Sequence, residues 1–349
     1  MHAISIQSTL TQGTLPPYYW IIFDKRLVIM QAIQAFLAAD MQRVDEVIRA
    51  RLHSEVALVS QVSEYIIASG GKRLRPALVL LSAGALDYKG VHHYELAAVV
   101  EFIHTATLLH DDVVDESSLR RGRETANALF GNAASVLVGD FLYSRAFQMM
   151  VGVGQMRVME VLSDATNVIA EGEVLQLMNC NDADISEDDY LRVIRYKTAK
   201  LFEAAVRLGA ILGGADAVTE AAMANYGMHL GTAFQLIDDV LDYSGDHAEI
   251  GKNVGDDLAE GKPTLPLLYL LKNGTAEQAK MVRHAIENGG LEVFEPILAA
   301  IQASGALDYT RAQAQREVDL ATAAIAALPD SQYKQNLIGL AEFAVARSY

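Results

Sequence analysis

Apolar residues recur along most of the chain at the spacing of one helix face. Residues 95–112 give a clear example, with apolar side chains at Leu96, Val99, Val100, Ile103 and Leu108. Recurrence every three or four residues is typical of an amphipathic helix. The pattern turns helical at about Met30, and further helices are predicted at residues 133–150, 160–179, 188–212 and 219–243.

The positions of proline favour long helices over strands. The seven prolines stand at 16, 17, 76, 263, 266, 296 and 329, so none lies between Ala77 and Lys262. Proline interrupts helices, and this interval is instead rich in Ala, Leu, Glu and Met, which are good helix formers. We therefore predict an all-α fold with a single domain over residues 30–349.

Polar and glycine-rich segments separate the predicted helices. Ser69-Gly70-Gly71 breaks the first pattern, and Pro76 follows where a first helical turn tolerates proline. Ser186 with Asp189 resembles a capping box. Loops are predicted at residues 116–132, 181–187 and 244–262, and peripheral helices at residues 276–288, 291–303, 309–327 and 331–347.

Residues 1–29 differ from the rest of the chain. They contain Thr14-Leu15-Pro16-Pro17 and the cluster Tyr18, Tyr19 and Trp20, without a helical period. They also lack the basic start, apolar core and small-residue cleavage site of a signal peptide. We expect a disordered extension or sequence upstream of the true start, with Met30 as a candidate initiator.

Composition narrows the classes of function. A net charge of −16 argues against a nucleic-acid partner, because phosphate backbones attract basic surfaces. Cys180 is the single cysteine, so no intrachain disulfide can form, which fits a reducing compartment and predicts a cytoplasmic location. No apolar run approaches the roughly 20 residues that a membrane-spanning helix needs.

The pattern Asp-Asp-x-x-Asp occurs twice, each time at the end of a predicted helix. The first copy is Asp111, Asp112 and Asp115, and the second is Asp238, Asp239 and Asp242. Positions i and i+4 share a helix face, and carboxylate oxygens are ligands that Mg²⁺ prefers. Aspartates at a helix end can simply face water. However, the helix dipole disfavours negative charge at a C-terminus, so two such clusters predict bound cations.

Basic residues near these motifs are candidates for phosphate binding. Lys72 and Arg75 lie in a Gly-Gly-Lys-Arg turn, where glycine lets the backbone approach a ligand, although the turn could also be a solvated connector. Arg120 and Arg121 follow the first motif, in a loop that either returns over it or forms a basic tip. The remaining candidates are His104, Lys197, Thr198, Gln235, Lys252 and Lys262. In isolation, a histidine such as His104 on an apolar helix is usually a core residue, and Lys262 could belong to an ordinary helix-start connector.

Together these residues resemble the trans-isoprenyl diphosphate synthase family, most of all its bacterial octaprenyl members. The first half matches in Gly71-Lys72-Arg73-x-Arg75-Pro76, His104, Leu109-His110-Asp-Asp-x-x-Asp and Arg120-Arg121. The second half matches in Glu173-x-x-Gln176, Lys197-Thr198, Phe234-Gln235-x-x-Asp238-Asp239-x-x-Asp242 and Gly251-Lys252-x-x-Gly255-x-Asp257. The resemblance covers about residues 30–349, and the extension before it is the one departure.

The resemblance implies a homodimer of helical bundles of the isoprenoid-synthase type, each around a deep central cavity with both motifs at its mouth. It implies a cluster of Mg²⁺ ions held by Asp111, Asp112, Asp115 and Asp238, with Asp239 and Asp242 in the same cluster. An allylic diphosphate would contact Arg120, Lys197, Thr198, Gln235, Lys252 and Lys262. Isopentenyl diphosphate would contact Lys72, Arg75, His104 and Arg121. The aspartates and Lys197 are the predicted catalytic residues.

Small side chains before the first motif favour a long product. The resemblance implies that Ala106 and Thr107 lie beneath the metal site, and Phe102, Phe147 and Met150 are candidates for the cavity floor. Alternatively, the two small residues only pack helices closely. We predict an octaprenyl product for a respiratory quinone, with peripheral membrane contact for its release. The alternatives are a shorter-chain synthase, a terpene cyclase or a non-catalytic subunit.

Overall fold

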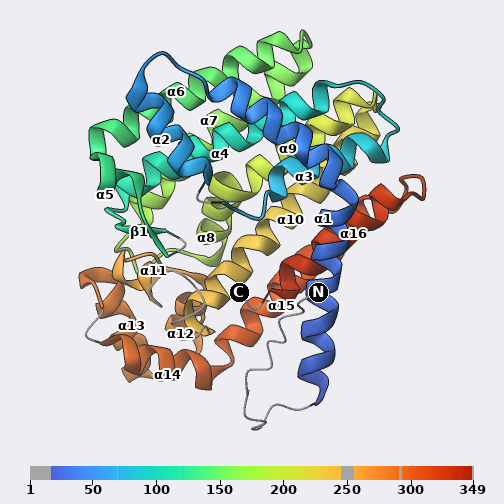
Figure 1. Cartoon of the computed structure of the whole chain (residues 1–349). Coiled ribbons are helices and arrows are strands. Elements are labelled where there is room, and N and C mark those ends of the chain that lie inside the picture. The colour runs from blue at the N-terminus through green and yellow to red at the C-terminus, as the bar shows by residue number, and fades with distance from the viewer. Residues whose placement is uncertain (1–16, 69, 121, 245–254, 291–292, 348–349) are drawn as a thin grey trace, which may run out of the picture.

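The computed structural model describes residues 17–68, 70–120, 122–244, 255–290 and 293–347, with side chains from residue 29 onward except that of Asp256. The predicted all-α fold is confirmed (Figure 1). The first helices are α1 (Pro17–Leu52), α2 (Ala57–Ala68), α3 (Leu74–Ala85), α4 (His92–Val114), α5 (Ala126–Phe130), α6 (Asn132–Gly152), α7 (Met156–Asn179), α8 (Glu187–Ile194), α9 (Lys200–Leu212) and α10 (Ala217–Ser244). The others are α11 (Asp256–Ala259), α12 (Leu265–Asn273), α13 (Ala276–Asn288), α14 (Phe294–Ser304), α15 (Ala306–Ala324) and α16 (Gln332–Ala346).

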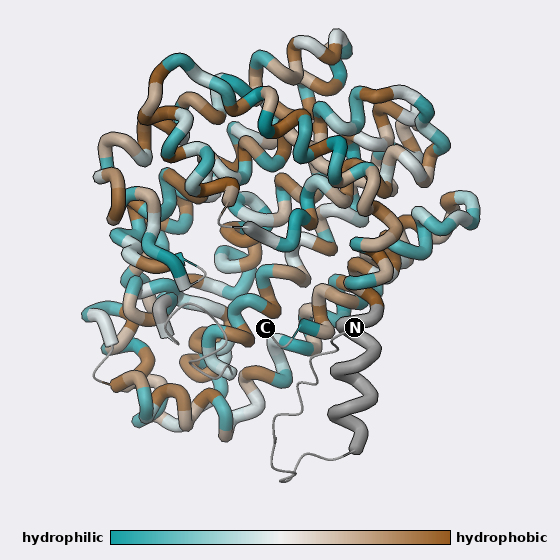
Figure 2. Tube along the Cα trace, viewed as in Figure 1, coloured by the Kyte–Doolittle hydropathy of each residue, from teal (hydrophilic) through white to brown (hydrophobic). Residues whose placement is uncertain are grey.

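Helix α10 crosses the bundle, with α9 and α15 packed along it (Figure 1). Helix α4 packs along α6, and α3 packs along α9. In Figure 2, apolar and polar segments alternate along most helices, as expected where one face of each helix is buried. The largest side chains of the core include Phe102, Phe202 and Tyr226, which are almost fully buried. This core fixes the C-terminal ends of α4 and α10, where the aspartate motifs lie.

A smaller group of helices, α11 to α14, surrounds the C-terminal end of α10 (Figure 1). Tyr243 of α10 packs there with Leu267, Ile286 and Ile297, all of them buried. The segment between α11 and α12 carries Lys262. Packing of this group therefore brings a cation to the first aspartate motif, which is distant in sequence.

The prediction of peripheral C-terminal helices was wrong for α15 and α16. Helix α15 packs along α10 and buries Ala314, Val318 and Ala321. Helix α16 packs on α1, α3 and α15 and buries Leu337 and Ala341. The buried face of α15 consists largely of small residues among many polar ones, so its hydrophobic pattern is weak although its packing is close.

Local structure differs from the sequence prediction in three other segments. The predicted loop at 116–132 contains a hairpin of β1 (Leu119–Arg120) and β2 (Arg123–Glu124), followed by α5. Within the described part of the predicted loop at 244–262, α11 forms one turn. The predicted helix at 188–212 is interrupted by η1 (Arg195–Ala199), a π-helical segment. The predicted capping box of Ser186 and Asp189 is confirmed at the start of α8.

The first helix begins at Pro17 and not near Met30. Proline is common at the first helical position, because its fixed backbone angle suits a helix and its missing amide hydrogen is not needed there. Residues 1–16 lie outside the described residues, so the prediction for the N-terminal extension stays a prediction there. Among the described helices, none has the length and apolar character needed to cross a bilayer.

Candidate active site

The first aspartate motif lies at the C-terminal end of α4, and each of its carboxylates faces a cation. Asp112 is fully buried, and Nε and Nη2 of Arg120 donate to its Oδ1 at 2.8 and 2.7 Å. Asp115 pairs with Lys262 Nζ at 3.1 Å, and Asp111 lies 3.7 Å from Lys197 Nζ. The helix dipole disfavours these carboxylates at a C-terminal end, and they also repel one another. The neighbouring cations offset both effects.

The hairpin of β1 and β2 returns Arg120 over the first motif. Tight pairing of Arg120 with Arg123 in the hairpin reverses the chain just after α4. Of the two interpretations of this loop, the structure therefore favours its return over the motif for Arg120. Arg121 and Lys252 lie outside the described residues.

The second motif lies in the last turns of α10. Asp238 accepts a hydrogen bond from Arg347 Nη1 at 2.8 Å, and Asp242 is half-buried nearby on the same helix. Asp239 is buried and accepts hydrogen bonds from the Tyr190 hydroxyl at 2.5 Å and from Gln235 Nε2 at 3.1 Å. From its spacing, Gln235 shares a helix face with Asp238. In the structure it also contacts Asp239, one turn further along the helix.

The π-helical segment η1 connects the two motifs through neighbouring residues. Lys197 Nζ contacts Glu173 Oε2 at 2.6 Å and Gln176 Oε1 at 2.5 Å on α7, besides lying near Asp111. The Thr198 hydroxyl donates to Gln235 Oε1 at 3.1 Å on α10. The predicted residues of both motifs therefore belong to a single site.

Burial perturbs the carboxyl groups of this site. Desolvation, with smaller repulsion from neighbouring aspartates, raises the pKa of Glu173 to about 7 and that of Asp239 to about 8. Burial also raises the pKa of Asp111, against the effect of Lys197. Burial alone would lower the pKa of Lys262, but Asp257, Asp115 and Glu260 outweigh it and raise that pKa. The site is a dense, partly dehydrated set of charges, as is common at functional sites.

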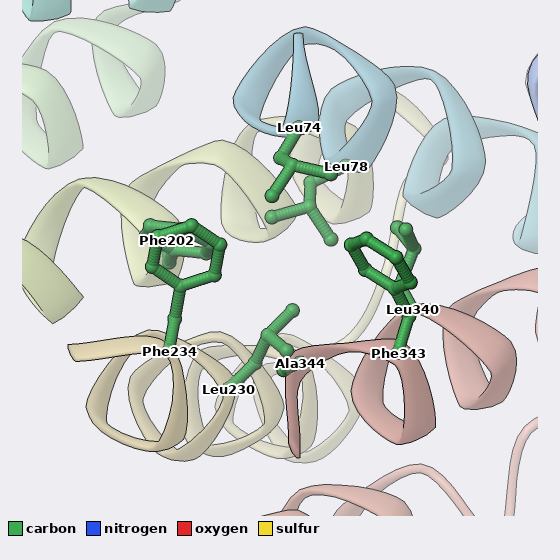
Figure 3. A pocket seen from close by; sticks show the side chains of 8 residues that line it. All are labelled: Leu74, Leu78, Phe202, Leu230, Phe234, Leu340, Phe343 and Ala344. Carbon is green, nitrogen blue, oxygen red and sulfur yellow. The ribbon is translucent and has the colours of Figure 1, made fainter. Parts of the chain in front are cut away.

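The glycine-rich turn before α3 lies beside an apolar cavity. Arg73 adopts a left-handed backbone with φ of 49° and pairs with Glu101 at 2.8 Å, which anchors the turn to α4. Lys72 Nζ lies 5.5 Å from the ring centre of Phe343, and the Arg75 guanidinium lies 4.6 Å from that of Phe202. The cavity, shown in Figure 3, is lined by Leu74, Leu78, Phe202, Leu230, Phe234, Leu340, Phe343 and Ala344.

A second cavity brings together part of the predicted isopentenyl diphosphate site. His104 and Arg120 line it with Gly70 and Glu101, between α2 and α4. Lys72 and Arg75 are not among its lining residues and stack on aromatic rings at the first cavity instead. The structure thus divides three of the four predicted contacts between two cavities, and the fourth, Arg121, lies outside the described residues.

The predicted product-length residues lie on facing helices. Ala106 of α4 is fully buried, and Phe147 of α6 is half-buried with its ring 5.6 Å from that of Tyr143. Thr107 is half-buried, and its hydroxyl donates to the carbonyl of His104 in its own helix at 2.8 Å. Because Ala106 is fully buried and α4 packs along α6 and other helices, a larger side chain at Ala106 would press on the surrounding core.

Sequence reasoning missed Arg347. Its side chain is 4% exposed, donates to the Phe234 carbonyl at 2.6 Å as well as to Asp238, and lies 3.6 Å from the Phe234 ring centre. Arg347 stands at the end of a helix that was predicted to be peripheral, so its sequence position gave no signal. Tyr190, whose hydroxyl donates to Asp239, was also missed, because it lies on a separate helix, α8.

We expect Arg347→Ala to lower the free energy of unfolding by about 2 kcal/mol, since it removes charge-assisted hydrogen bonds and a ring contact from a buried side chain. Urea titration measures this change. Arg311→Ala is the control, because Arg311 is 48% exposed and its ion pair within the described residues is with exposed Asp308. It should change stability by less than about 0.5 kcal/mol. Equal effects of the two variants would contradict the assigned contacts.

Comparison with known proteins identifies the family. The polyprenyl synthetase family model matches residues 56–300. The chain belongs to the polyprenyl synthetase family. It is 57% identical over 319 residues to an octaprenyl diphosphate synthase of Escherichia coli. The aligned residues cover 91% of this chain and 99% of the E. coli chain. Family membership confirms the predicted enzyme class, a prenyltransferase.

Structures of other polyprenyl synthases share the fold. A polyprenyl synthase from Caulobacter crescentus, solved with calcium and isoprenyl diphosphate, superposes with a TM-score of 0.89 at 45% identity, over 92% of this chain and 98% of that one. A decaprenyl diphosphate synthase from Rhodobacter capsulatus gives a TM-score of 0.87 at 48% identity, over 92% and 99%. The predicted isoprenoid-synthase architecture is thereby confirmed for the synthetase.

Proposed function

We propose that the synthetase adds isopentenyl diphosphate units in sequence to an allylic diphosphate, farnesyl diphosphate, and releases a long all-trans product. The product is octaprenyl diphosphate, for the side chain of a respiratory quinone. The identity of 57% to the E. coli octaprenyl diphosphate synthase, across nearly all of that enzyme, carries the proposal. The single site that joins both aspartate motifs supports it independently.

The site residues fit divalent metal ions, and we propose Mg²⁺. Asp112 Oδ2 is buried and has no hydrogen-bond partner among the described residues, so it offers an oxygen ligand. Within the described residues, no three acidic, histidine or cysteine side chains converge on one point. This suits Mg²⁺, which usually takes one or two carboxylates and completes its shell with water and substrate phosphate. Asp111, Asp112, Asp115 and Asp238 would be ligands, and Asp239 and Asp242 would complete the cluster.

The protein's own residues perform distinct steps. Bound metal ions would neutralise the diphosphate and make it a better leaving group. Lys197, Arg120 and Lys262, which now pair with the first motif, would turn to the oxygens of the allylic diphosphate and stabilise the charge that develops as it departs. The double bond of isopentenyl diphosphate then attacks the allylic cation, and the released pyrophosphate accepts the proton. Apolar walls exclude water, which would quench the cation.

An assay of the purified chain with farnesyl diphosphate, isopentenyl diphosphate and Mg²⁺ tests this function. We expect a ladder of prenyl diphosphates that ends at octaprenyl, identified by mass spectrometry. A ladder that ends early indicates a shorter-chain synthase, and a cyclic hydrocarbon indicates a cyclase. No product from the chain alone indicates a subunit that needs a partner.

We expect chelation to abolish activity without unfolding the protein. Each aspartate of the first motif already faces a protein cation, and Asp238 and Asp239 have donors too, so removal of metal exposes no unpaired cluster. Thermal unfolding with excess EDTA should therefore match that of untreated protein, while turnover stops and returns with added Mg²⁺. A large drop in Tm would show instead that metal holds the fold together.

The homodimer, the cytoplasmic location and the peripheral membrane contact stay predictions. Exposed apolar side chains support a partner surface on α6 and α7. Leu137, Met156, Leu177 and Met178 are each more than 60% exposed. Isolated exposed apolar residues are ordinary, but several on two neighbouring helices are typical of an interface.

A further inference from the structure

The segment that carries Lys197 and Thr198 is held between two glycines. In η1 the amide of Lys200 donates to the carbonyl of Arg195, five residues back, where an α-helix would bond four back. This extra residue places Lys197 and Thr198 toward different helices, α7 and α10. Single π-helical turns are rare in proteins, and many of those known lie at functional sites. The contacts that maintain this turn therefore bear on function.

Gly172 of α7 lies against the backbone of η1 on one side. A Cβ atom at this position would lie 2.6 Å from the amide nitrogen of Lys197 and 2.9 Å from the carbonyl carbon of Tyr196. Both contacts are to backbone, which cannot move aside as the end of a flexible side chain can. A side chain at Gly172 would therefore displace η1 itself.

Gly231 of α10 also lies against η1, at the residue Ala199. A Cβ atom there would lie 2.5 Å from Cα and 2.8 Å from Cβ of Ala199, which is fully buried. The segment is thus confined from two helices at once. A side chain at either glycine would therefore disturb the packing of η1 on that helix.

On both helices, a glutamine one turn after the glycine accepts a hydrogen bond from a side chain of η1. Four residues after Gly172, Gln176 accepts a hydrogen bond from Lys197 Nζ. Four residues after Gly231, Gln235 accepts a hydrogen bond from the Thr198 hydroxyl. On each helix a glycine lets the backbone of η1 approach closely, and a glutamine one turn later on the same face accepts a hydrogen bond from a side chain of η1.

We propose that Gly172 and Gly231 are positioning residues for the prenyl transfer, acting through Lys197 and Thr198 respectively. The proposal rests on the proposed function, in which Lys197 binds the allylic diphosphate, together with the contact of Thr198 to the same diphosphate that the family resemblance implies. Gly172 sets the distance of the Lys197 ammonium from the first motif, and Gly231 sets the Thr198 hydroxyl against the second. Neither glycine contacts the substrate.

Gly172→Ala and Gly231→Ala test the proposal, with Gly209→Ala as matched control. Gly209 of α9 is equally confined, because a Cβ atom there would lie 2.6 Å from the backbone nitrogen of Ala83, but it borders α3 and not η1. Urea titration gives the folded fraction of each variant. Per folded enzyme, we expect kcat to fall roughly 10- to 100-fold in the two test variants, because small displacements of catalytic groups carry losses of this order.

The KM values and double variants separate positioning from general damage. In the test variants the KM for farnesyl diphosphate should rise and that for isopentenyl diphosphate should not, while Gly209→Ala keeps both values. Gly172→Ala should add little to the loss in Lys197→Met, and Gly231→Ala little to that in Thr198→Val, because residues that act through one another are not additive. Full additivity, or losses no larger than in Gly209→Ala, would overturn the proposal.

Binding of magnesium pyrophosphate, measured by calorimetry, gives a second readout that needs no turnover. We expect about 10-fold weaker binding in the test variants than in wild type and Gly209→Ala. If wild type makes no prenyl product, the proposed function fails. The binding of magnesium pyrophosphate in the variants then still tests whether Gly172 and Gly231 position Lys197 and Thr198. If both test variants fail to fold, the glycines serve the fold itself and the proposal fails.

Discussion

Asp238→Asn should lower kcat roughly 100- to 1000-fold and leave the fold intact, as expected when one group that stabilises transition-state charge is lost. The carboxylate is 42% exposed, so its ion pair with Arg347 contributes little to stability. The Asn amide oxygen can still accept the hydrogen bond from Arg347, which keeps that side chain in place. Activity and stability should therefore separate in this variant.

Steady-state kinetics over a range of Mg²⁺ concentrations measures this effect. We expect the Mg²⁺ concentration for half-maximal rate to rise together with the fall in kcat. Asp308→Asn is the control, because Asp308 is an 87% exposed helical aspartate that also pairs with an arginine. Both variants should unfold at wild-type urea concentration. An Asp238→Asn enzyme with wild-type kcat would remove Asp238 from the metal cluster.

Ala106→Tyr should shorten the product by several isoprene units. Ala106 has no exposed surface and lies in α4 close before the first motif, where we expect a ring to block the path of the growing chain. Overpacking a buried site costs about 1–3 kcal/mol, so we expect a destabilised but folded enzyme. Mass spectrometry of the products after complete reaction measures the chain length.

Ala106→Ser provides the matched comparison, since it keeps a small side chain at the same position. We expect wild-type product length from it. A folded Ala106→Tyr enzyme that still makes the full-length product would contradict the role in chain length. Complete unfolding of the Tyr variant would support the other interpretation, in which Ala106 only lets α4 and α6 pack closely.

The sequence predicted those parts of the site that depend on local spacing. The two aspartate motifs end long helices, as their apolar patterns indicate, and the return of Arg120 follows from a short loop after α4. The fold class followed from helical spacing and the absence of proline over a long interval. In each case the interactions that decide the structure lie within a few turns of chain.

Contacts between distant segments could not be predicted in this way. Nothing in the residues near Arg347 indicates that it reaches Asp238, because that contact depends on how α16 packs across the bundle. The π-helical turn was also missed, since residues 188–212 carry an unbroken helical pattern. The two glycines that lie against this turn, Gly172 and Gly231, stand on two other helices, α7 and α10. Tertiary packing thus decided what local propensity left open.

The burial of Arg347 near the end of the chain bears on how the protein can be handled. Its guanidinium is fixed to Phe234 and Asp238 directly after the last residue of α16. An affinity tag or fluorescent fusion joined at this end would pull on a side chain that contacts a proposed metal ligand. Purification handles therefore belong at the other terminus, and loss of activity in a C-terminally tagged preparation would be an artefact of its design.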